Sequence, residues 1–146
     1  MPKDSVLFRY TLLAALFIAA GALWGQQPGT AQVARGKYLV EGVALCGDCH
    51  TAHNEKGEPD RARWLMGAPL DFQPIQPIPI FAKIAPPIAG LPAGWTEAEV
   101  AKFLQTGIGR DGKPRRPPMP QYRLNQADAA AVAAYLKSLQ PASKPQ

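Results

Sequence analysis

Several features are scarce or missing in this sequence, and each absence excludes a class of protein. The chain has no internal repeat and no glycine-rich nucleotide-binding motif. Its formal net charge of +5 is too modest to be the signature of a nucleic-acid-binding protein. Strand-like and helical segments do not alternate, so a thioredoxin-like fold is not expected. Cysteine is also scarce, because the 146 residues include only two.

Both cysteines lie in one pentapeptide, Cys46-Gly47-Asp48-Cys49-His50. The spacing Cys-x-x-Cys-His predicts covalent attachment of a c-type haem. Two thiols three residues apart can form thioether bonds to the two vinyl groups of one porphyrin, while the adjoining imidazole binds the iron. We therefore expect one covalent haem c per chain, held by Cys46 and Cys49, with His50 as an axial ligand of the iron.

Three other interpretations of these residues remain open at this point. A redox-active Cys-x-x-Cys pair would need a surrounding βαβ pattern. A zinc site could be drawn from Cys46, Cys49, His50 and His53, although ligands so close in sequence depart from the usual separated pairs. A disulfide between the two cysteines would close a very short, strained loop. The spacing favours haem attachment over all three.

The first 31 residues have the order of a secretory signal. Lys3 and Arg9 precede an apolar run from Tyr10 to Trp24, and a polar stretch follows. The run is shorter than the roughly 20 residues that span a bilayer, and no strong cleavage site stands out after it. Residues 1–31 are therefore either a cleaved export signal or an N-terminal membrane anchor. Both outcomes place the rest of the chain on the periplasmic side of a bacterial inner membrane.

Residues 32–140 are expected to form one small domain, and residues 141–146 a loose C-terminal tail. Apolar residues at helical spacing predict three main helices. These helices cover residues 31–44, 97–106 and 126–139. The first runs directly into Cys46, so the haem would be attached at its end.

The two later helices carry terminal signals in the sequence. Thr96 and Glu99 form a capping box at the start of the second helix, and Gly107 ends it. Asn125 is the N-cap of the third helix, which Pro141 stops. These signals predict an all-α fold.

Prolines recur throughout residues 69–92 and exclude a regular helix or an interior strand there. The same stretch is rich in isoleucine, which disordered linkers usually lack. A porphyrin is a large apolar plate around which such a loop can fold, and this would explain its length. We therefore expect long proline-rich loops wrapped around the haem.

The second axial ligand of the iron would come from a methionine. Met66 and Met119 are the candidates outside the export segment. Pro118 and Pro120 flank Met119 and fix its backbone, which lessens the entropy lost when its sulfur binds the metal. Met119 also lies far enough along the chain to reach the haem face opposite His50. We expect Met119 to be the ligand and Met66 to fill a gap in the core.

The motif at residues 46–50, the segment Pro118-Met119-Pro120 and the last helix with Ala134-Tyr135-Leu136 together resemble a class I monohaem cytochrome c. The resemblance covers about residues 31–139. It implies that Gly36 on the first helix contacts Tyr135 and Leu136 on the last. It also implies a proline carbonyl that accepts a hydrogen bond from the proximal imidazole. Gly67-Ala68-Pro69-Leu70 suggests Pro69 for that role.

The resemblance further implies an electron-transfer protein rather than an enzyme. With His50 and Met119 both bound, the iron has no open site, which leaves transfer of one electron between a dehydrogenase or respiratory donor and a terminal acceptor. The protein could be the cytochrome subunit of an oxidoreductase complex. Five cations around Met119 would face an acidic redox partner. They are Arg110, Lys113, Arg115, Arg116 and Arg123.

Two rival functions depend on the distal side of the haem. If Met119 does not hold the iron firmly, the protein would instead be a haem-based binder or sensor of CO, NO or O2. A peroxidase-like enzyme would need a distal acid–base pair, which the sequence does not offer. The sequence leaves open the role of the stretch 69–92.

Overall fold

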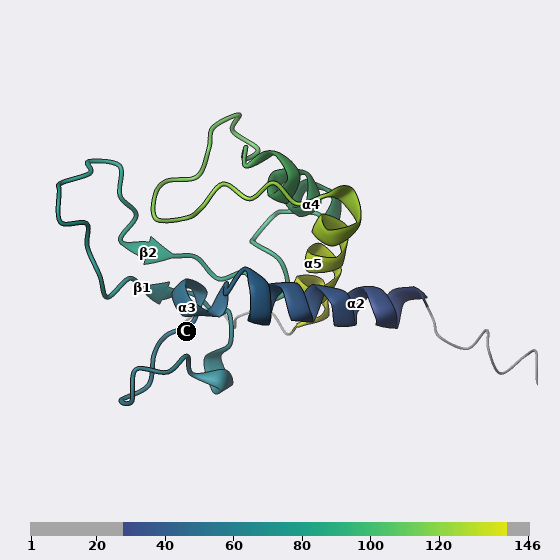
Figure 1. The fold of residues 1–146 in the computed structure, drawn as a ribbon, viewed down its shortest axis with the longest axis horizontal. Coiled ribbons are helices and arrows are strands. Elements are labelled where there is room, and N and C mark those ends of the chain that lie inside the picture. Colours follow the sequence, from purple (N-terminus) through teal and green to yellow (C-terminus); the bar gives the residue numbers. More distant parts are fainter. Residues whose placement is uncertain (1–27, 140–146) are drawn as a thin grey trace, which may run out of the picture. The chain divides into compact units, whose positions relative to one another are not determined.

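The computed structural model describes residues 28–139 of the chain (Figure 1). Residues 1–27 of the predicted export segment and the whole of the predicted C-terminal tail lie outside the described residues. The chain divides into two units, residues 1–31 and 32–146, and the account below concerns the second. No helix within residues 28–139 has the length and hydropathy needed to cross a membrane.

The first helical segment is longer than predicted and changes from an α-helix to a π-helix before the cysteine motif. Helix α2 spans Pro28–Tyr38, and a π-helical turn, Leu39–Val43, continues it. The amide of Ala44 donates to the carbonyl of Leu39 at 2.7 Å, which is the wider hydrogen-bond spacing of a π turn. Such turns often occur at functional sites, and this one leads into the one-turn helix α3, Gly47–His50.

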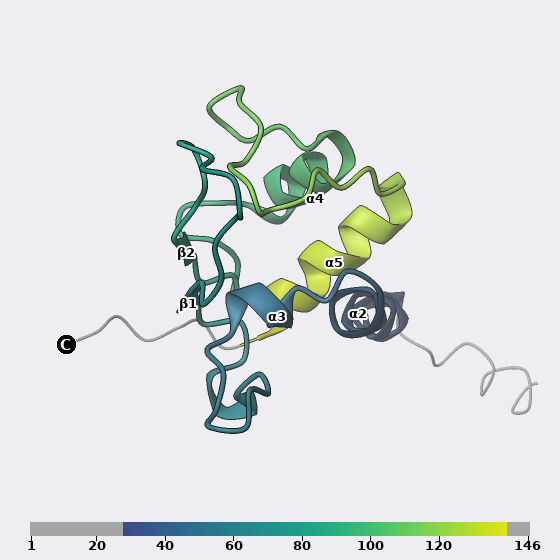
Figure 2. The same ribbon diagram turned by 60° about the vertical axis from the view of Figure 1, so that its left-hand side comes forward.

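The two later helices confirm the predictions made from their caps. Helix α4 spans Glu97–Thr106 with the capping box of Thr96 and Glu99, and it ends at Gly107, whose φ is 72°. Helix α5 spans Gln126–Ser138, and the Asn125 side chain accepts from the amide of Asp128 at 2.9 Å. The two helices pack against each other (Figures 1 and 2). The fold is all-α, as predicted, with one two-stranded ladder.

The ladder closes the base of the proline-rich loop. Strand β1, Ala68–Pro69, pairs antiparallel with β2, Ile84–Ala85. Beyond it, the amide of Leu70 donates to the carbonyl of Lys83 at 2.9 Å. The intervening loop extends from the side of the domain away from α4 and α5 (Figures 1 and 2). It is folded on itself by an edge-to-face contact of Phe72 and Phe81, and Ile75 at its tip is 99% exposed.

The core joins the turn before the cysteine motif to α4, α5 and two loop segments. Its buried members are Leu39, Val40, Leu65, Ala89, Val100, Leu104, Ala129, Val132, Ala133, Tyr135 and Leu136. Trp95 and Phe103 pack edge to face beside it, with ring centroids 5.9 Å apart. Seven of these eleven residues come from α4 and α5, so these two helices supply most of the core.

Candidate haem site

The cysteine motif is presented on a short, well-fixed turn. Cys46 precedes α3, and Cys49 and His50 lie on it. Both cysteines are free thiols, so the disulfide interpretation is wrong. Burial raises the pKa of Cys46 to about 11, and burial followed by the negative charge of Asp48 raises that of Cys49. Two neutral, unpaired thiols are the groups that thioether attachment requires.

His50 is held in one orientation by a backbone carbonyl. Its Nδ1 lies 2.7 Å from the carbonyl oxygen of Pro86. A carbonyl can only accept, so Nδ1 must carry the proton and donate it. Burial lowers the pKa of the imidazole, although the Pro86 bond opposes this shift. The ring is therefore neutral, and Nε2 keeps a lone pair for a metal, as in other sites where a second partner fixes the ligand.

The expectation for Pro69 is wrong. Pro69 is exposed on β1, where it is paired with Ile84. The amide of Gly67, two residues earlier, donates to the backbone carbonyl of His50 at 2.8 Å, so this segment binds the main chain of His50 and not its ring. The partner strand β2 runs directly into Pro86, which supplies the acceptor. Ala85-Pro86-Pro87-Ile88 has the Pro-x-aliphatic spacing without an insertion, and this signal was missed.

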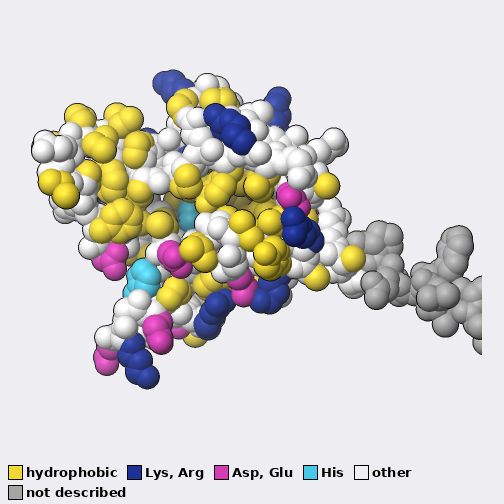
Figure 3. Space-filling view, in the orientation of Figure 1, with side chains coloured by type: hydrophobic (Ala, Val, Ile, Leu, Met, Phe, Trp, Pro, Cys, Tyr) yellow, Lys and Arg dark blue, Asp and Glu magenta, His cyan; other side chains and the backbone are white. Residues whose placement is uncertain are grey.

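Met119 is brought to the same place as His50, and the two side chains are in contact. Figure 3 shows a hollow on this face of the domain, bordered by hydrophobic side chains. The amide of Met119 donates to the carbonyl of Arg116 at 3.2 Å, so the proline-flanked segment forms a turn. Met66 lies one residue before Gly67, in the segment that binds the His50 backbone.

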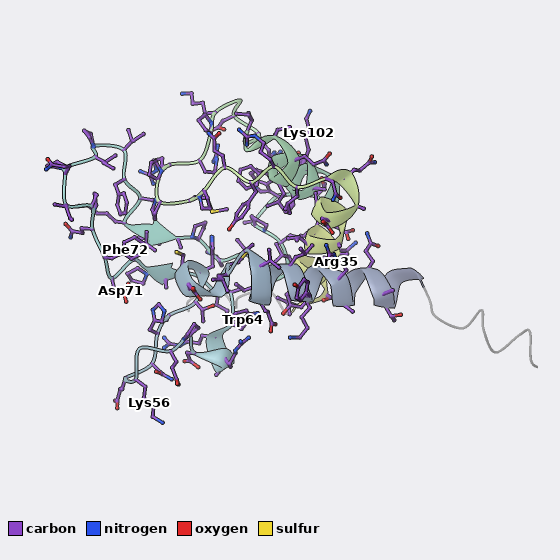
Figure 4. The ribbon with its side chains drawn as sticks, viewed as in Figure 1. Arg35, Lys56, Trp64, Asp71, Phe72 and Lys102 are labelled. Carbon is purple, nitrogen blue, oxygen red and sulfur yellow. The ribbon has the colours of Figure 1, made fainter. Side chains whose placement is uncertain are left out.

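Trp64 packs against the backbone of the cysteine motif, and its role was not identified from the sequence. A Cβ atom at Gly47 would overlap the Trp64 indole, so the ring lies directly on the backbone of the motif. The indole N–H donates to the hydroxyl of Tyr135 at 3.3 Å, and the Arg61 guanidinium lies 3.9 Å from the ring centroid. Figure 4 labels Trp64 beside α2 and α3. The glycine within the motif was the available signal.

Tyr122 is a second residue that the sequence did not reveal. Its hydroxyl donates to the carbonyl of Ala44 at 2.9 Å. Burial raises its pKa to about 12, with further contributions from the neighbouring Cys46 and Cys49. The phenol oxygen of Tyr122 therefore lies close to the two cysteines that are predicted to attach the haem.

The five cations predicted to form a docking face differ in how they are bound. Arg115 pairs with Asp111, and Arg110 pairs with Glu99 at 3.1 Å. Arg123 donates to the side chain of Gln121 at 2.7 Å. Among the residues that the structure describes, no ion pair involves Lys113 or Arg116, and both are exposed. The side chains of these two have no hydrogen bond or ion pair among the described residues, whereas Arg123 keeps its bond to Gln121.

The zinc interpretation finds no support in the geometry. His53 pairs with Asp71 at 3.5 Å and is half-buried. Among residues 28–139, no group of three or more histidine, cysteine, aspartate or glutamate side chains is placed to hold a metal ion. The set of donors instead fits a covalent haem, because it combines two free thiols, an imidazole with Nε2 available, and a thioether in contact with that imidazole.

Comparison with known proteins identifies relatives of the same kind. The family model described as Cytochrome c matches residues 33–140. The chain is 32% identical over 126 residues to a protein named Diheme cytochrome c-type from Cereibacter sphaeroides, covering 82% of this chain and 40% of the relative.

Two components of dehydrogenases are also similar. The chain is 30% identical over 115 residues to the Fructose dehydrogenase cytochrome subunit of Gluconobacter japonicus, covering 72% of this chain and 21% of the relative. It is 30% identical over 132 residues to a subunit of nicotinate dehydrogenase from Pseudomonas putida, covering 86% of this chain and 10% of the relative. The chain thus spans less than half the length of each of these three relatives.

Proposed function

The chain belongs to the cytochrome c family, whose members transfer electrons, and on that basis we propose that it is an exported one-electron carrier with a single His/Met-ligated haem c. Cys46 and Cys49 would attach the haem, and His50 and Met119 would bind its iron. A single haem follows from the sequence, because the chain has two cysteines and both belong to one motif.

The contact between His50 and Met119 is the observation that carries this proposal. The two residues are far apart in the sequence, so only the folding of the chain brings them together. His50 already uses Nδ1 on Pro86, so the nitrogen left for a ligand is Nε2. An imidazole and a thioether that converge in this way match the axial pair of electron-transfer haems.

Pro86, His50 and Met119 would control how the haem iron is bound and which ligands can reach it. When bound, the haem supplies the Fe(III)/Fe(II) couple. The Pro86 carbonyl keeps His50 in the tautomer that can bind the iron. Met119 would occupy the remaining axial position and exclude oxygen and other small ligands, and a thioether in that position raises the reduction potential. No side chain needs to move a proton, which distinguishes a carrier from a haem enzyme.

We propose that the donor is a dehydrogenase and that the chain acts as its cytochrome subunit or soluble acceptor. Two relatives are named as dehydrogenase subunits, which supports this choice. Lys113 and Arg116 would steer an acidic partner towards the haem. The charged, apolar and polar order of residues 1–31 supports a periplasmic location, either after cleavage or with the segment as an anchor.

The test is spectroscopy of the purified holoprotein. A carrier should show a six-coordinate haem in both oxidation states, a reversible one-electron wave in voltammetry, and only slow carbon monoxide binding in the reduced form, because the methionine must first leave the iron. Ready binding of carbon monoxide to the reduced wild-type protein would instead identify a ligand binder or sensor.

A further inference from the structure

Three hydrogen bonds among the described residues join the segment that carries Met119 to the rest of the domain. The amide of Ala82 donates to the carbonyl of Pro117 at 2.7 Å, before Met119. The amide of Leu124 donates to the carbonyl of Leu104 on α4 at 3.0 Å, after Met119. Between them, Tyr122 donates to Ala44. The third attachment differs from the others because a side chain makes it.

The hydrogen bond from Tyr122 ends at Ala44, two residues before Cys46. Its acceptor, the carbonyl of Ala44, belongs to the peptide that precedes Leu45. Leu45 has a φ of 49°, a left-handed conformation that a leucine adopts only when its surroundings impose it. One hydrogen bond therefore links the methionine segment to the strained turn that presents the first cysteine.

We propose that Tyr122 is a positioning residue that keeps the sulfur of Met119 on the haem iron. The inference rests on the proposed ligation by Met119 and adds the residue that makes that ligation firm. Tyr122 is three residues from Met119, so its hydroxyl fixes how far the methionine segment can move from the haem-attachment turn. Without the bond, the hydrogen bonds described between residues 116–124 and the rest of the domain are those at Pro117 and Leu124.

The size of the effect follows from the strength of one hydrogen bond. A neutral hydrogen bond contributes about 1 kcal/mol net. Its loss from the ligated state alone shifts the balance between bound and released Met119 by about fivefold. Such a shift leaves most of the resting protein ligated, but it is visible wherever the methionine must compete for the iron.

The experiment compares Tyr122→Phe with Tyr135→Phe in the full-length holoprotein. Both changes remove one hydroxyl from a tyrosine that packs in or against the core, and both keep the ring. The Tyr135 hydroxyl donates to Glu41 at 2.7 Å, accepts from the Trp64 indole, and makes no hydrogen bond to the methionine segment among the described residues, so Tyr135 is the matched control. The long-wavelength charge-transfer band of the ferric protein, which reports the bond between the methionine sulfur and the iron, is followed as pH rises. Carbon monoxide binding is followed in the ferrous protein.

For Tyr122→Phe we expect the band to be half lost about half a pH unit or more below the wild-type midpoint. We also expect carbon monoxide to bind about fivefold faster. Tyr135→Phe should keep the wild-type midpoint and rate even if it unfolds more readily in urea. Equal behaviour of Tyr122→Phe and wild type, or equal shifts in both variants, would refute the positioning role. Absence of the band from the wild type would instead overturn ligation by Met119 itself.

Discussion

Gly36 on α2 lies so close to the backbone carbonyl of Ala131 on α5 that a Cβ atom at position 36 would overlap it. The same added atom would lie 2.7 Å from the Cβ of Tyr135, so no side chain other than hydrogen fits the crossing. This close approach fixes α2 against α5. Because α2 leads through the π turn to Cys46, the crossing also sets where the cysteine motif lies.

Gly36→Ala should therefore destabilise the holoprotein. The overlap involves backbone atoms that cannot turn aside, and forcing an extra methyl group into a packed contact costs about 1–3 kcal/mol. Urea denaturation should give a lower midpoint with a similar slope. Gly42→Ala is the control, because its added Cβ would be 3.6 Å from the Tyr38 ring, an ordinary contact. An unchanged midpoint for Gly36→Ala would contradict the described crossing.

The two cysteines should each contribute one thioether bond. Haem should remain with wild-type protein through denaturation in acidified organic solvent, at one haem per chain. Cys46→Ala or Cys49→Ala should leave one bond, shift the reduced absorption band to longer wavelength, and lower the yield of holoprotein. Mass spectrometry and the pyridine haemochrome spectrum provide the measurements. Haem that extracts freely from the wild type would contradict covalent attachment.

Met119→Ala should remove the ferric charge-transfer band, lower the reduction potential as the thioether is lost, and open the reduced iron to carbon monoxide. Met66→Ala is the matched control and should do none of these. Spectra and voltammetry on both variants decide between the two methionines. Retention of the band in Met119→Ala together with its loss in Met66→Ala would assign the ligand to Met66.

Arg116→Glu should slow electron exchange with an acidic redox partner. Arg116 is exposed next to Pro117 and Met119 and has no ion pair among the described residues, so its charge is available to an approaching surface. Stopped-flow rates should fall several-fold at low ionic strength and converge with wild type at high salt, because screening shortens the range of the attraction.

Lys56→Glu is the control for that measurement, since it makes the same change of charge at an exposed position distant from Arg116 in the sequence. Figure 4 labels Lys56 on its loop. A docking role for Arg116 requires the control to retain a rate close to that of wild type. Equal slowing by both variants would show that only the total charge matters.

Glu41 should make the stability depend on pH. Burial alone would raise the pKa of its carboxyl, but the hydrogen bonds from Lys37 and Tyr135, at 2.6 and 2.7 Å, outweigh it and hold the pKa below its ordinary value. A lowered folded-state pKa adds stability above the unfolded-state pKa, which is near 4.3, and this stability is lost as pH falls through the folded-state value.

Glu41→Gln should therefore be less stable than wild type by about 1 kcal/mol at pH 7, and the difference should shrink as pH falls below about 4. Urea denaturation at several pH values measures both. Glu55→Gln, at an exposed glutamate, should match wild type throughout. A difference for Glu41→Gln that stays constant down to pH 3 would show that the charge of Glu41 is not what stabilises the fold.

Local signals were enough to predict α4 and α5. A capping box at Thr96, a glycine at position 107 and an N-cap at Asn125 act within one or two turns of the chain, so they can be read directly from it. The motif at residues 46–50 was equally local. The contact of Gly36 with Tyr135 was implied by resemblance and is confirmed by the structure.

Long-range contacts explain what could not be predicted. Pro69 and Pro86 are both prolines near an aliphatic residue, and only the pairing of β1 with β2 decides which carbonyl meets His50. Trp64 and Tyr122 act on residues far away in the sequence, so no periodicity marks them. The pairing of Arg115 with Asp111 likewise distinguishes it from Arg116, although the two are neighbours and look alike in the sequence.

The closed base of the proline-rich loop has an evolutionary consequence. Its two ends meet at Leu70 and Lys83, so the distance between β1 and β2 does not depend on how many residues lie between them. Gly67 and Pro86, which hold His50, lie outside that closure. Residues 71–81 can therefore be lengthened, shortened or replaced without changing the hydrogen bonds that Gly67 and Pro86 make to His50. The exposed tip of the loop is thus free to vary while the geometry around His50 stays the same.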